Sequence, residues 1–267
     1  MTRGIVIFAY NNELIDYVAM AAWSARNIHR HLGLPVCVVT DATDLPAHYE
    51  FDQVVNTTKH SEYNRYFSDF ADTVTWYNKN RMDAYQLSPW DQTLVLDADY
   101  VVASDQLLTL FDSGQDFLAH NRAYDVIGAE PFCSNNTFGR YHMPMSWATV
   151  MFFTRSRTAN LIFDTMHMIR DNWPHYQDLY GITPATYRND YALTIAQLIV
   201  NGQTLTWPTI PWPLASVTPS PKVTQQAADQ YRVDYINGQG QARWITVTHD
   251  FHVMGKRHLG DIVANPC

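Results

Sequence analysis

The chain has 267 residues, of which 46% are hydrophobic and 16% charged, and its formal net charge at pH 7 is −8. A chain of this length can bury a large core and allows one α/β domain or two small ones. The acidic balance provides no overall positive field, so composition argues against a protein that binds nucleic acid or an anionic membrane through charge alone.

The cysteines and the apolar segments indicate the compartment. Cys37, Cys133 and Cys267 are odd in number and lack metal-ligand spacing, which is typical of reduced thiols. The apolar segment at residues 5–10 is too short for the core of a signal peptide, and no run approaches the length of a membrane span. We therefore expect a cytoplasmic location.

The first 41 residues predict a strand, a helix and a second strand. Residues 4–12 form an apolar run that ends in a polar turn, residues 17–32 have helical spacing up to Gly33, and residues 35–41 are again apolar and end in Asp41. This length and pattern are typical of a βαβ unit. No Gly-x-Gly-x-x-Gly follows the first strand, so a nucleotide would be held by strand-end side chains: Ala9, Tyr10, Asn11 and Asp41. An ordinary turn or cap residue is an equal interpretation of Asp41.

The next segments lead to the centre of the chain. Residues 51–56 predict a third strand, and the polar, aromatic residues 59–76 predict a surface loop with at most one helical turn. Residues 80–87 predict a helix with Arg81 near its N-terminal end. A cation there can bind phosphate oxygens beside the helix dipole, whereas a solvated arginine is the plain alternative.

Residues 93–102 read Thr-Leu-Val-Leu-Asp-Ala-Asp-Tyr-Val-Val and predict a strand buried on both faces. Asp97 and Asp99 stand at its carboxyl end, where open α/β sheets bind ligands. Two carboxylates there repel each other and resist desolvation, so they favour a divalent cation between them, shared with a diphosphate. A turn or cap pair after a core strand is the alternative, because aspartate is abundant in this chain.

The second half of the chain is predicted to contain short strands and helices around one long segment, residues 120–146. Strands are predicted at residues 117–119 and 147–153, helices at residues 107–111, 158–172 and 187–196, and one strand that ends in histidines at residues 244–256. The helix at residues 158–172 is amphipathic, and its predicted buried face consists of Leu161, Ile162, Thr165, Met168 and Ile169. Residues 120–146 lack a sustained period and predict a functional loop. Prolines exclude residues 207–213 from a central strand, and residues 237–240 predict a hairpin turn.

This order of elements, with Val-Leu-Asp-Ala-Asp and a late His-x-x-Gly-Lys, resembles the GT-A-fold glycosyltransferases, and in particular the glycogenin and lipopolysaccharide-galactosyltransferase group. The resemblance implies an α/β fold: a single Rossmann-like domain over residues 1–267, with a mixed, mainly parallel central sheet flanked by helices. It also implies that residues 1–100 bind the nucleotide and that residues 101–267 hold the acceptor, with a metal- and phosphate-binding segment at the C-terminal end.

The resemblance further implies a donor and metal site. Asp97, Asp99 and His252 match the metal ligands, and imidazole beside carboxylates favours Mn²⁺ over Mg²⁺. Arg81 lies sixteen positions before Asp97, where the group has a lysine over the sugar diphosphate. The remaining donor positions are Ala98, Gly255 and Lys256. The family lysine usually follows the glycine by three positions, where His258 stands, so either Lys256 or His258 neutralises the leaving group; His249 is the rival metal ligand.

Asn189 and Asp190 match the pair that faces sugar and acceptor in the related enzymes. Asp190 would be the general base of an inverting reaction, or would stabilise an oxocarbenium-like state in a retaining one. As a plain alternative, a carboxylate in a first helical turn is stabilised by the helix dipole alone. Trp147 and Trp212 are the aromatic candidates for stacking on an acceptor.

The expected reaction is transfer of a sugar from a UDP-sugar to a hydroxyl group. The N-terminal segment also resembles bacteriophage-encoded relatives, some of which glycosylate hydroxymethylated DNA bases. DNA carrying such bases, in the host cytoplasm, is therefore one expected acceptor, and an intracellular glycan, lipid or protein is the alternative. Two rival classes remain: a haloacid-dehalogenase-type phosphatase, for which only Asp261 offers a later acidic partner, and a non-catalytic sugar-nucleotide-binding module.

Overall fold

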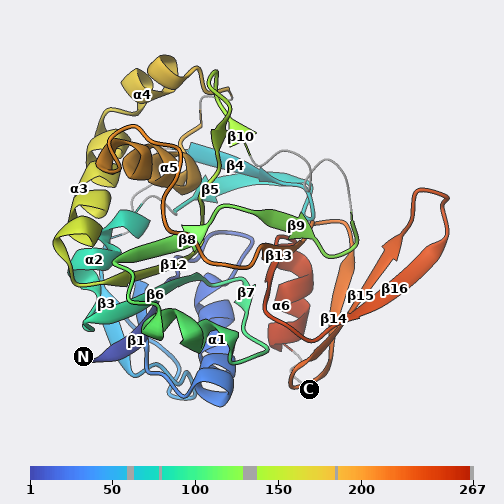
Figure 1. Cartoon of the computed structure of the whole chain (residues 1–267). Helices are drawn as coiled ribbons and strands as arrows, with labels where there is room; N and C mark the ends of the chain where they lie inside the picture. The colour runs from blue at the N-terminus through green and yellow to red at the C-terminus, as the bar shows by residue number, and fades with distance from the viewer. Residues whose placement is uncertain (59–62, 78–79, 129–136, 184–185, 265–267) are drawn as a thin grey trace.

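A computed structural model of the whole chain describes residues 1–58, 63–77, 80–128, 137–183 and 186–264 (Figure 1). The predictions for residues 59–62, and for residues 129–136 of the predicted loop at residues 120–146, lie outside the described residues.

A six-stranded sheet forms the centre of the molecule. In spatial order its strands are β3 (Gln53–Asn56), β2 (Val36–Thr40), β1 (Arg3–Phe8), β6 (Gln92–Asp97), β12 (Trp147–Thr154) and β8 (Phe117–His120). The pairs β3–β2, β2–β1 and β1–β6 are parallel, whereas β12 runs antiparallel to both of its neighbours. The predicted mixed, mainly parallel sheet is confirmed.

Helices cover both faces of this sheet. Side chains of the middle strands point alternately to the two faces, and because both sets are apolar, each face is buried in a core of its own. On β1, Ile5 and Ile7 pack into a core with α1 (Tyr17–Leu32) and α6 (Lys256–Ala264). Val6 and Phe8 point to the opposite core, which contains α3 (Arg157–Asp171) and α5 (Asn189–Val200). A strand that is buried on both faces consists of a nearly continuous run of apolar residues. Such runs in the sequence predicted β1 and β6.

The helix ends follow from local chemistry. Asp16 accepts a hydrogen bond from the backbone N–H of Ala19 at 2.9 Å and so begins α1. Gly33 ends α1 with a φ of 61°, a left-handed conformation that glycine adopts without steric cost. In α3, the prediction that Leu161 and Met168 are buried is wrong: they are 48% and 43% exposed, because the core face of this helix is centred on Ile162, Phe163, Met166 and Ile169.

A smaller sheet lies beside the carboxyl ends of the central strands. Its strands, in order, are β7 (Tyr100–Val101), β17 (Phe251–Val253), β13 (Leu214–Val217) and β9 (Ala123–Asp125). The apolar run at residues 93–102 is thus divided between two sheets, and residues 98–99 form the connection. The prediction of one strand over residues 244–256 is also wrong, because residues 248–250 separate β16 from β17.

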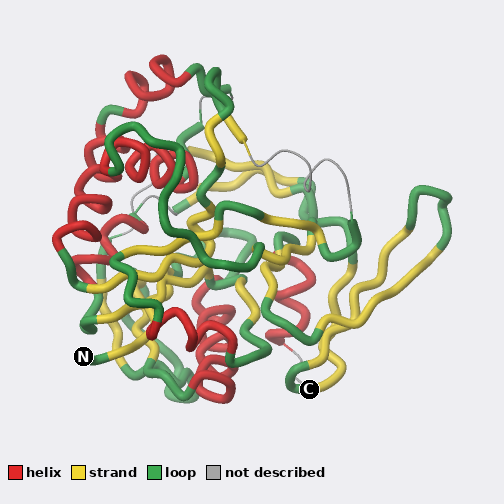
Figure 2. The backbone as a smooth tube through the Cα atoms, viewed as in Figure 1, coloured by secondary structure: helices red, strands yellow, loops and turns green. Residues whose placement is uncertain are grey.

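Two further β units complete the fold (Figure 2). β4 (Tyr63–Phe67) and β5 (Asp72–Trp76) form an antiparallel hairpin where the sequence predicts a loop. β14 (Lys222–Ala227), β15 (Gln230–Ile236) and β16 (Ala242–Val247) form a three-stranded antiparallel sheet, with the predicted turn at residues 237–240 between β15 and β16. The β15–β16 hairpin projects from the body of the molecule (Figure 1).

The remaining elements are short. They are a 3-10 helix at Arg81–Asp83 that continues as α2 (Ala84–Leu87), a second 3-10 helix at Gln106–Asp112, the strand pair β10 (Thr137–Phe138) and β11 (Met143–Pro144), and α4 (Trp173–Tyr180). Within the described ranges, no helix has both the length and the apolar character needed to cross a lipid bilayer.

Candidate active site

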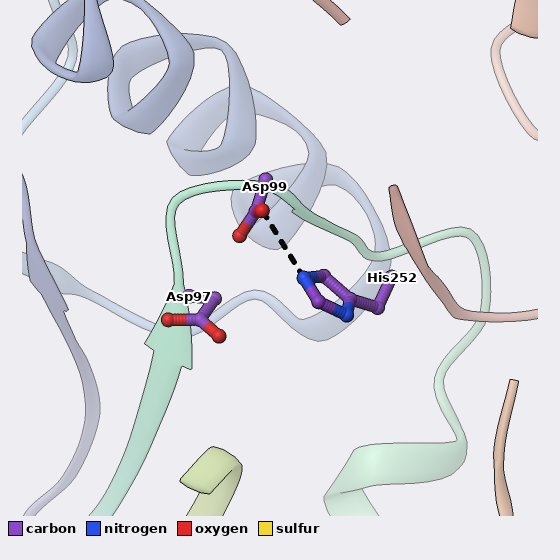
Figure 3. A group of neighbouring side chains, drawn as sticks. All are labelled: Asp97, Asp99 and His252. Carbon is purple, nitrogen blue, oxygen red and sulfur yellow. Dashed lines mark hydrogen bonds and ion pairs between the residues drawn. The ribbon is translucent and has the colours of Figure 1, made fainter. Parts of the chain in front are cut away.

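The two aspartates of the central run lie where the two sheets meet. Asp97 is the last residue of β6, and Asp99 lies in the connection to β7. β7 pairs with β17 so that Tyr100 is opposite His252, and the backbone N–H of Val253 donates to the Asp99 carbonyl at 3.0 Å. This strand pairing brings His252 beside Asp99 although 153 positions separate them in the sequence (Figure 3).

Asp97, Asp99 and His252 have the geometry of a metal site. One potential ligand atom from each residue lies within 4.8 Å of the others. His252 Nε2 is 3.1 Å from Asp99 Oδ2, and Figure 3 shows the Asp99 carboxylate directed toward the imidazole. The side chains are 16%, 7% and 13% exposed, in the order given. Carboxylate oxygens with one imidazole suit Mn²⁺ and are compatible with Mg²⁺, so the residues fit the expected cation.

Each carboxylate also has a buried cationic partner. Lys256, the first residue of α6, forms an ion pair with Asp99 and donates to the Val253 carbonyl at 3.2 Å. Arg81 forms an ion pair with Asp97 and donates to the Ala148 carbonyl at 2.6 Å. These pairs compensate charges that burial would otherwise make very costly.

The pKa of Asp99 is the result of opposed effects. Burial raises the pKa of this carboxyl group, but Lys256 and His252 together lower it well below its usual range. Asp99 is therefore an anion at neutral pH, which is the state that a metal ligand requires.

Asp190 is held rigidly in the first turn of α5. Its Oδ1 accepts from the backbone N–H of Ala148 at 2.9 Å, and its Oδ2 accepts from Arg188 Nη2 at 2.7 Å. Burial raises the pKa of Asp190, and Arg188 and the Ala148 hydrogen bond outweigh that effect, so the net shift is downward. Because the Ala148 carbonyl also accepts from Arg81, one residue of β12 connects the surroundings of Asp97 and Asp190.

A cavity of about 420 Å³ joins these groups. Its volume lies in the range that small-molecule sites occupy. Ionisable side chains line one part of it: Arg65, Arg81, Asp97, Asp99, Arg188, Asp190, His252 and Lys256. Aromatic rings line much of the rest: Tyr10, Tyr17, Tyr63, Trp76, Tyr77, Trp147 and Tyr191. The combination suits a ligand with both an anionic part and flat or ring-shaped parts.

The predicted site residues divide into two groups. Those that line the cavity are Tyr10, Arg81, Asp97, Ala98, Asp99, Trp147, Asn189, Asp190, His252 and Lys256. The others have different surroundings. Ala9 is fully buried in the core, and Asn11 accepts from the backbone N–H of Val18 at 2.9 Å near the start of α1. Asp41 follows the end of β2, outside the set of residues that line this cavity.

Three further candidates are not among the residues that line this cavity. A Cβ atom on Gly255 would come within 3.1 Å of the Pro219 carbonyl, so the glycine permits a close approach of two backbone segments. The Trp212 ring lies 6.5 Å from the His120 ring, and His249 Nε2 lies 3.1 Å from the hydroxyl of Tyr124.

The sequence prediction missed several cavity residues, of which Tyr63, Arg65 and Trp76 belong to the β4–β5 hairpin and Arg188 precedes α5. The signal for the hairpin was present as two short segments on either side of residues 68–71: residues 63–67 contain three aromatic residues, and residues 72–76 contain three β-branched residues and a tryptophan. For Arg188, its position two residues before Asp190 was the available signal.

No protein-family model and no curated protein sequence matches the chain. Among solved structures, the chain is similar to the apo form of the glycosyltransferase GlyE from Streptococcus pneumoniae TIGR4, with 13% identity over 79% of this chain and a TM-score of 0.42. It covers 45% of the GlyE chain, less than half of that protein's length. It is also similar to the galactosyltransferase LgtC in complex with donor and acceptor sugar analogs, with 14% identity over 73% of this chain and 70% of that chain, and a TM-score of 0.43. A likeness at this level concerns the course of the backbone and does not identify what the chain does.

Proposed function

We propose that this chain is a metal-dependent glycosyltransferase that moves a sugar from a UDP-sugar to a hydroxyl acceptor. The observation that supports the proposal best is the convergence of Asp97, Asp99 and His252 on one cavity at the carboxyl end of β6. This edge of an α/β sheet is where ligands bind, and the donor set suits a divalent cation that is shared with a diphosphate.

In this proposal Asp97, Asp99 and His252 hold Mn²⁺ or Mg²⁺, which when bound supplies electrostatic stabilisation of the departing diphosphate. Lys256 lies at the start of α6, where its charge and the helix N-terminus both favour phosphate oxygens. Arg81 lines the same cavity and holds the Asp97 carboxylate in position.

Asp190 is the proposed catalytic carboxylate. In an inverting reaction its oxygen would accept the proton of the acceptor hydroxyl group, and in a retaining reaction it would stabilise positive charge on the sugar. Its two hydrogen bonds, from Ala148 and Arg188, fix its orientation, which supports either role because a positioned carboxylate needs no reorganisation during the reaction. Asn189 lies beside it on the cavity wall.

The phosphatase alternative requires a later acidic residue next to Asp97 and Asp99. Asp261, the residue considered for that role, lies in α6 and lines a second cavity, of about 570 Å³, between α1 and α6. This position disfavours a phosphatase.

The acceptors considered for the transferase are DNA that carries hydroxymethylated bases and a glycan, lipid or protein hydroxyl group. Trp147 is the aromatic candidate that lies on the cavity wall.

The test is a panel of UDP-sugars incubated with Mn²⁺ and the full chain, with hydroxymethylated DNA and small hydroxyl acceptors offered side by side and the products measured by mass spectrometry. We expect transfer that stops with excess chelator and in Asp99→Asn, and that continues in Asp229→Asn, a control for an exposed aspartate. Binding of a UDP-sugar without transfer or hydrolysis over the whole panel would favour a non-catalytic module. Turnover that survives chelation or Asp99→Asn would contradict the proposed mechanism.

A further inference from the structure

The β4–β5 hairpin forms one wall of the candidate active site. Its register pairs Tyr63 with Trp76 and Arg65 with Val74, so these four side chains share one face of the hairpin. Phe67, on the same face, is only 5% exposed and belongs to the core, so this face is turned toward the body of the molecule. Tyr63, Arg65 and Trp76 line the cavity that contains Asp97 and Asp99.

Contacts at two places hold the hairpin across the cavity. Asn12, which follows β1, donates through Nδ2 to the Thr75 carbonyl at 3.3 Å. At the hairpin turn, Asp69 accepts from the backbone N–H of Arg257 at 2.9 Å, and the Arg257 guanidinium lies 5.7 Å from the centre of the Phe70 ring. The hairpin therefore extends from the carboxyl end of β1 to the first turn of α6, in contrast to the projecting β15–β16 hairpin (Figure 1).

Arg65 differs from the other cations of the cavity wall. Arg81, Lys256 and Arg188 each form an ion pair, with Asp97, Asp99 and Asp190 in that order. Within the described part of the chain, Arg65 has no carboxylate partner and instead lies over two aromatic rings, 5.4 Å from the centre of Phe67 and 5.8 Å from that of Trp76. Stacking orients a guanidinium group while leaving its charge and its planar N–H donors available to a ligand.

Arg65 and Asp99 line one cavity together with Tyr17. Tyr17 is the first residue of α1 and lines the cavity. Burial raises the pKa of its hydroxyl group, Asp99 raises it further, and Arg65 lowers it. Arg65 and Asp99 line the same cavity, so an anion bound beside Asp99 would share that cavity with the Arg65 guanidinium group.

We propose that Arg65 is a donor-binding residue whose guanidinium group contacts the diphosphate oxygens of a nucleoside diphosphate bound at Asp97 and Asp99. The inference rests on the proposed function and adds to it a cation from a segment far from the Asp-x-Asp and His-x-x-Gly-Lys elements. A planar guanidinium group can donate two parallel hydrogen bonds to phosphate oxygens, which a lysine at the same position cannot. Phe67 and Trp76 reduce the ordering cost of that contact because they already hold the side chain.

The experiment measures UDP affinity by isothermal titration calorimetry on the full chain in the presence of Mn²⁺. Arg65→Gln should weaken UDP binding about tenfold or more, and Arg65→Lys should show a smaller loss. Arg232→Gln is the matched control, because Arg232 lies 5.0 Å from the Trp244 ring on the projecting sheet, and it should bind UDP like the natural chain. Uridine, which lacks the diphosphate, should bind with unchanged affinity to Arg65→Gln.

The outcomes separate this inference from the function on which it rests. UDP affinity within twofold of the natural chain in Arg65→Gln would overturn the role of Arg65 and leave the glycosyltransferase proposal intact. An equal loss of uridine affinity would also overturn it, because the substitution would then act through the shape of the hairpin. If the natural chain binds no UDP in the presence of Mn²⁺, both proposals fail.

Discussion

Asp99 and His252 meet at 3.1 Å because β7 and β17 pair directly after the Asp-x-Asp connection. Neither residue could reach the other without the small second sheet, which turns the chain away from β6 immediately after Asp97. The proposed metal site is therefore a product of topology: the central sheet supplies one carboxylate, the connection supplies the second, and the second sheet supplies the imidazole.

The first prediction concerns this imidazole. His252→Ala should weaken Mn²⁺ binding by at least about tenfold, because it removes one of the three proposed protein ligands. Titration of Mn²⁺ followed by electron paramagnetic resonance measures the affinity. His249→Ala is the control, because His249 contacts Tyr124 instead of the aspartates, and its affinity should equal that of the natural chain. Equal Mn²⁺ affinity in His252→Ala would remove His252 from the site.

The second prediction concerns the buried pair of Lys256 and Asp99. Lys256→Met should lower the free energy of unfolding by about 3 kcal/mol, because it leaves the Asp99 carboxylate buried without its main counter-charge. The double variant Asp99→Asn with Lys256→Met should recover part of that loss. Urea unfolding without metal measures both values. A loss in Lys256→Met no larger than in Lys222→Met, an exposed control, would show that the ion pair does not contribute to stability.

The third prediction concerns catalysis. Asp190→Asn should lower kcat about 100-fold or more while leaving UDP affinity unchanged, because the residue is proposed to act on the acceptor hydroxyl group or on the sugar. Asp190 also accepts from Ala148 and Arg188, so a circular dichroism melt should accompany the kinetics to confirm that the variant is folded. Unchanged kcat in a folded Asp190→Asn would assign the catalytic role elsewhere.

The fourth prediction concerns pH and a buried histidine outside the cavity. Burial lowers the pKa of His120 to about 4, while its Nδ1 hydrogen-bonds to the Trp212 carbonyl at 2.9 Å. As the pH falls, the unfolded chain therefore protonates His120 before the folded chain does, at its unfolded pKa of about 6.5. The stability that the neutral His120 contributes is fully present above that pH and is lost as the pH falls toward 4. The loss should be about 3 kcal/mol across that window.

His120→Leu provides the comparison for this pH dependence. The variant should lose less stability than the natural chain between pH 6.5 and 4 in urea unfolding measured at several pH values, although its stability at neutral pH is lower because the Trp212 carbonyl loses a donor. Parallel pH profiles for the two proteins would show that His120 does not cause the acid sensitivity.

Much of the architecture could be predicted because the central strands are buried on both faces. A nearly continuous apolar run such as that of β6 leaves little choice of structure, and caps such as Asp16 and Gly33 mark the helix ends locally. The end of β6 at Asp97 was less predictable, because Tyr100 and Val101 continue the apolar pattern but pair with β17. Which sheet a short apolar segment joins depends on long-range pairing, which local pattern does not encode.

The same limit applies to the candidate site. Asp97 and Asp99 stand out in the sequence because these carboxylates interrupt an apolar run that predicts a buried strand. A buried carboxylate pair needs a cationic partner, so the expectation of a metal ion follows from the pair itself. The ion pairs of Arg81 with Asp97 and of Lys256 with Asp99 connect residues 16 and 157 positions apart, so no local signal reveals them. The role of Arg65 could not be predicted, because the contacts that place its hairpin beside the cavity come from Asn12 and Arg257, which are distant in the sequence.

The most direct test of the central claim is the location of the metal. Crystals of the full chain grown with Mn²⁺ and UDP should show a single anomalous manganese peak within bonding distance of Asp97, Asp99 and His252, with the diphosphate on its open side. A manganese peak at any other place, or an ordered UDP with no metal between it and these three residues, would contradict the account.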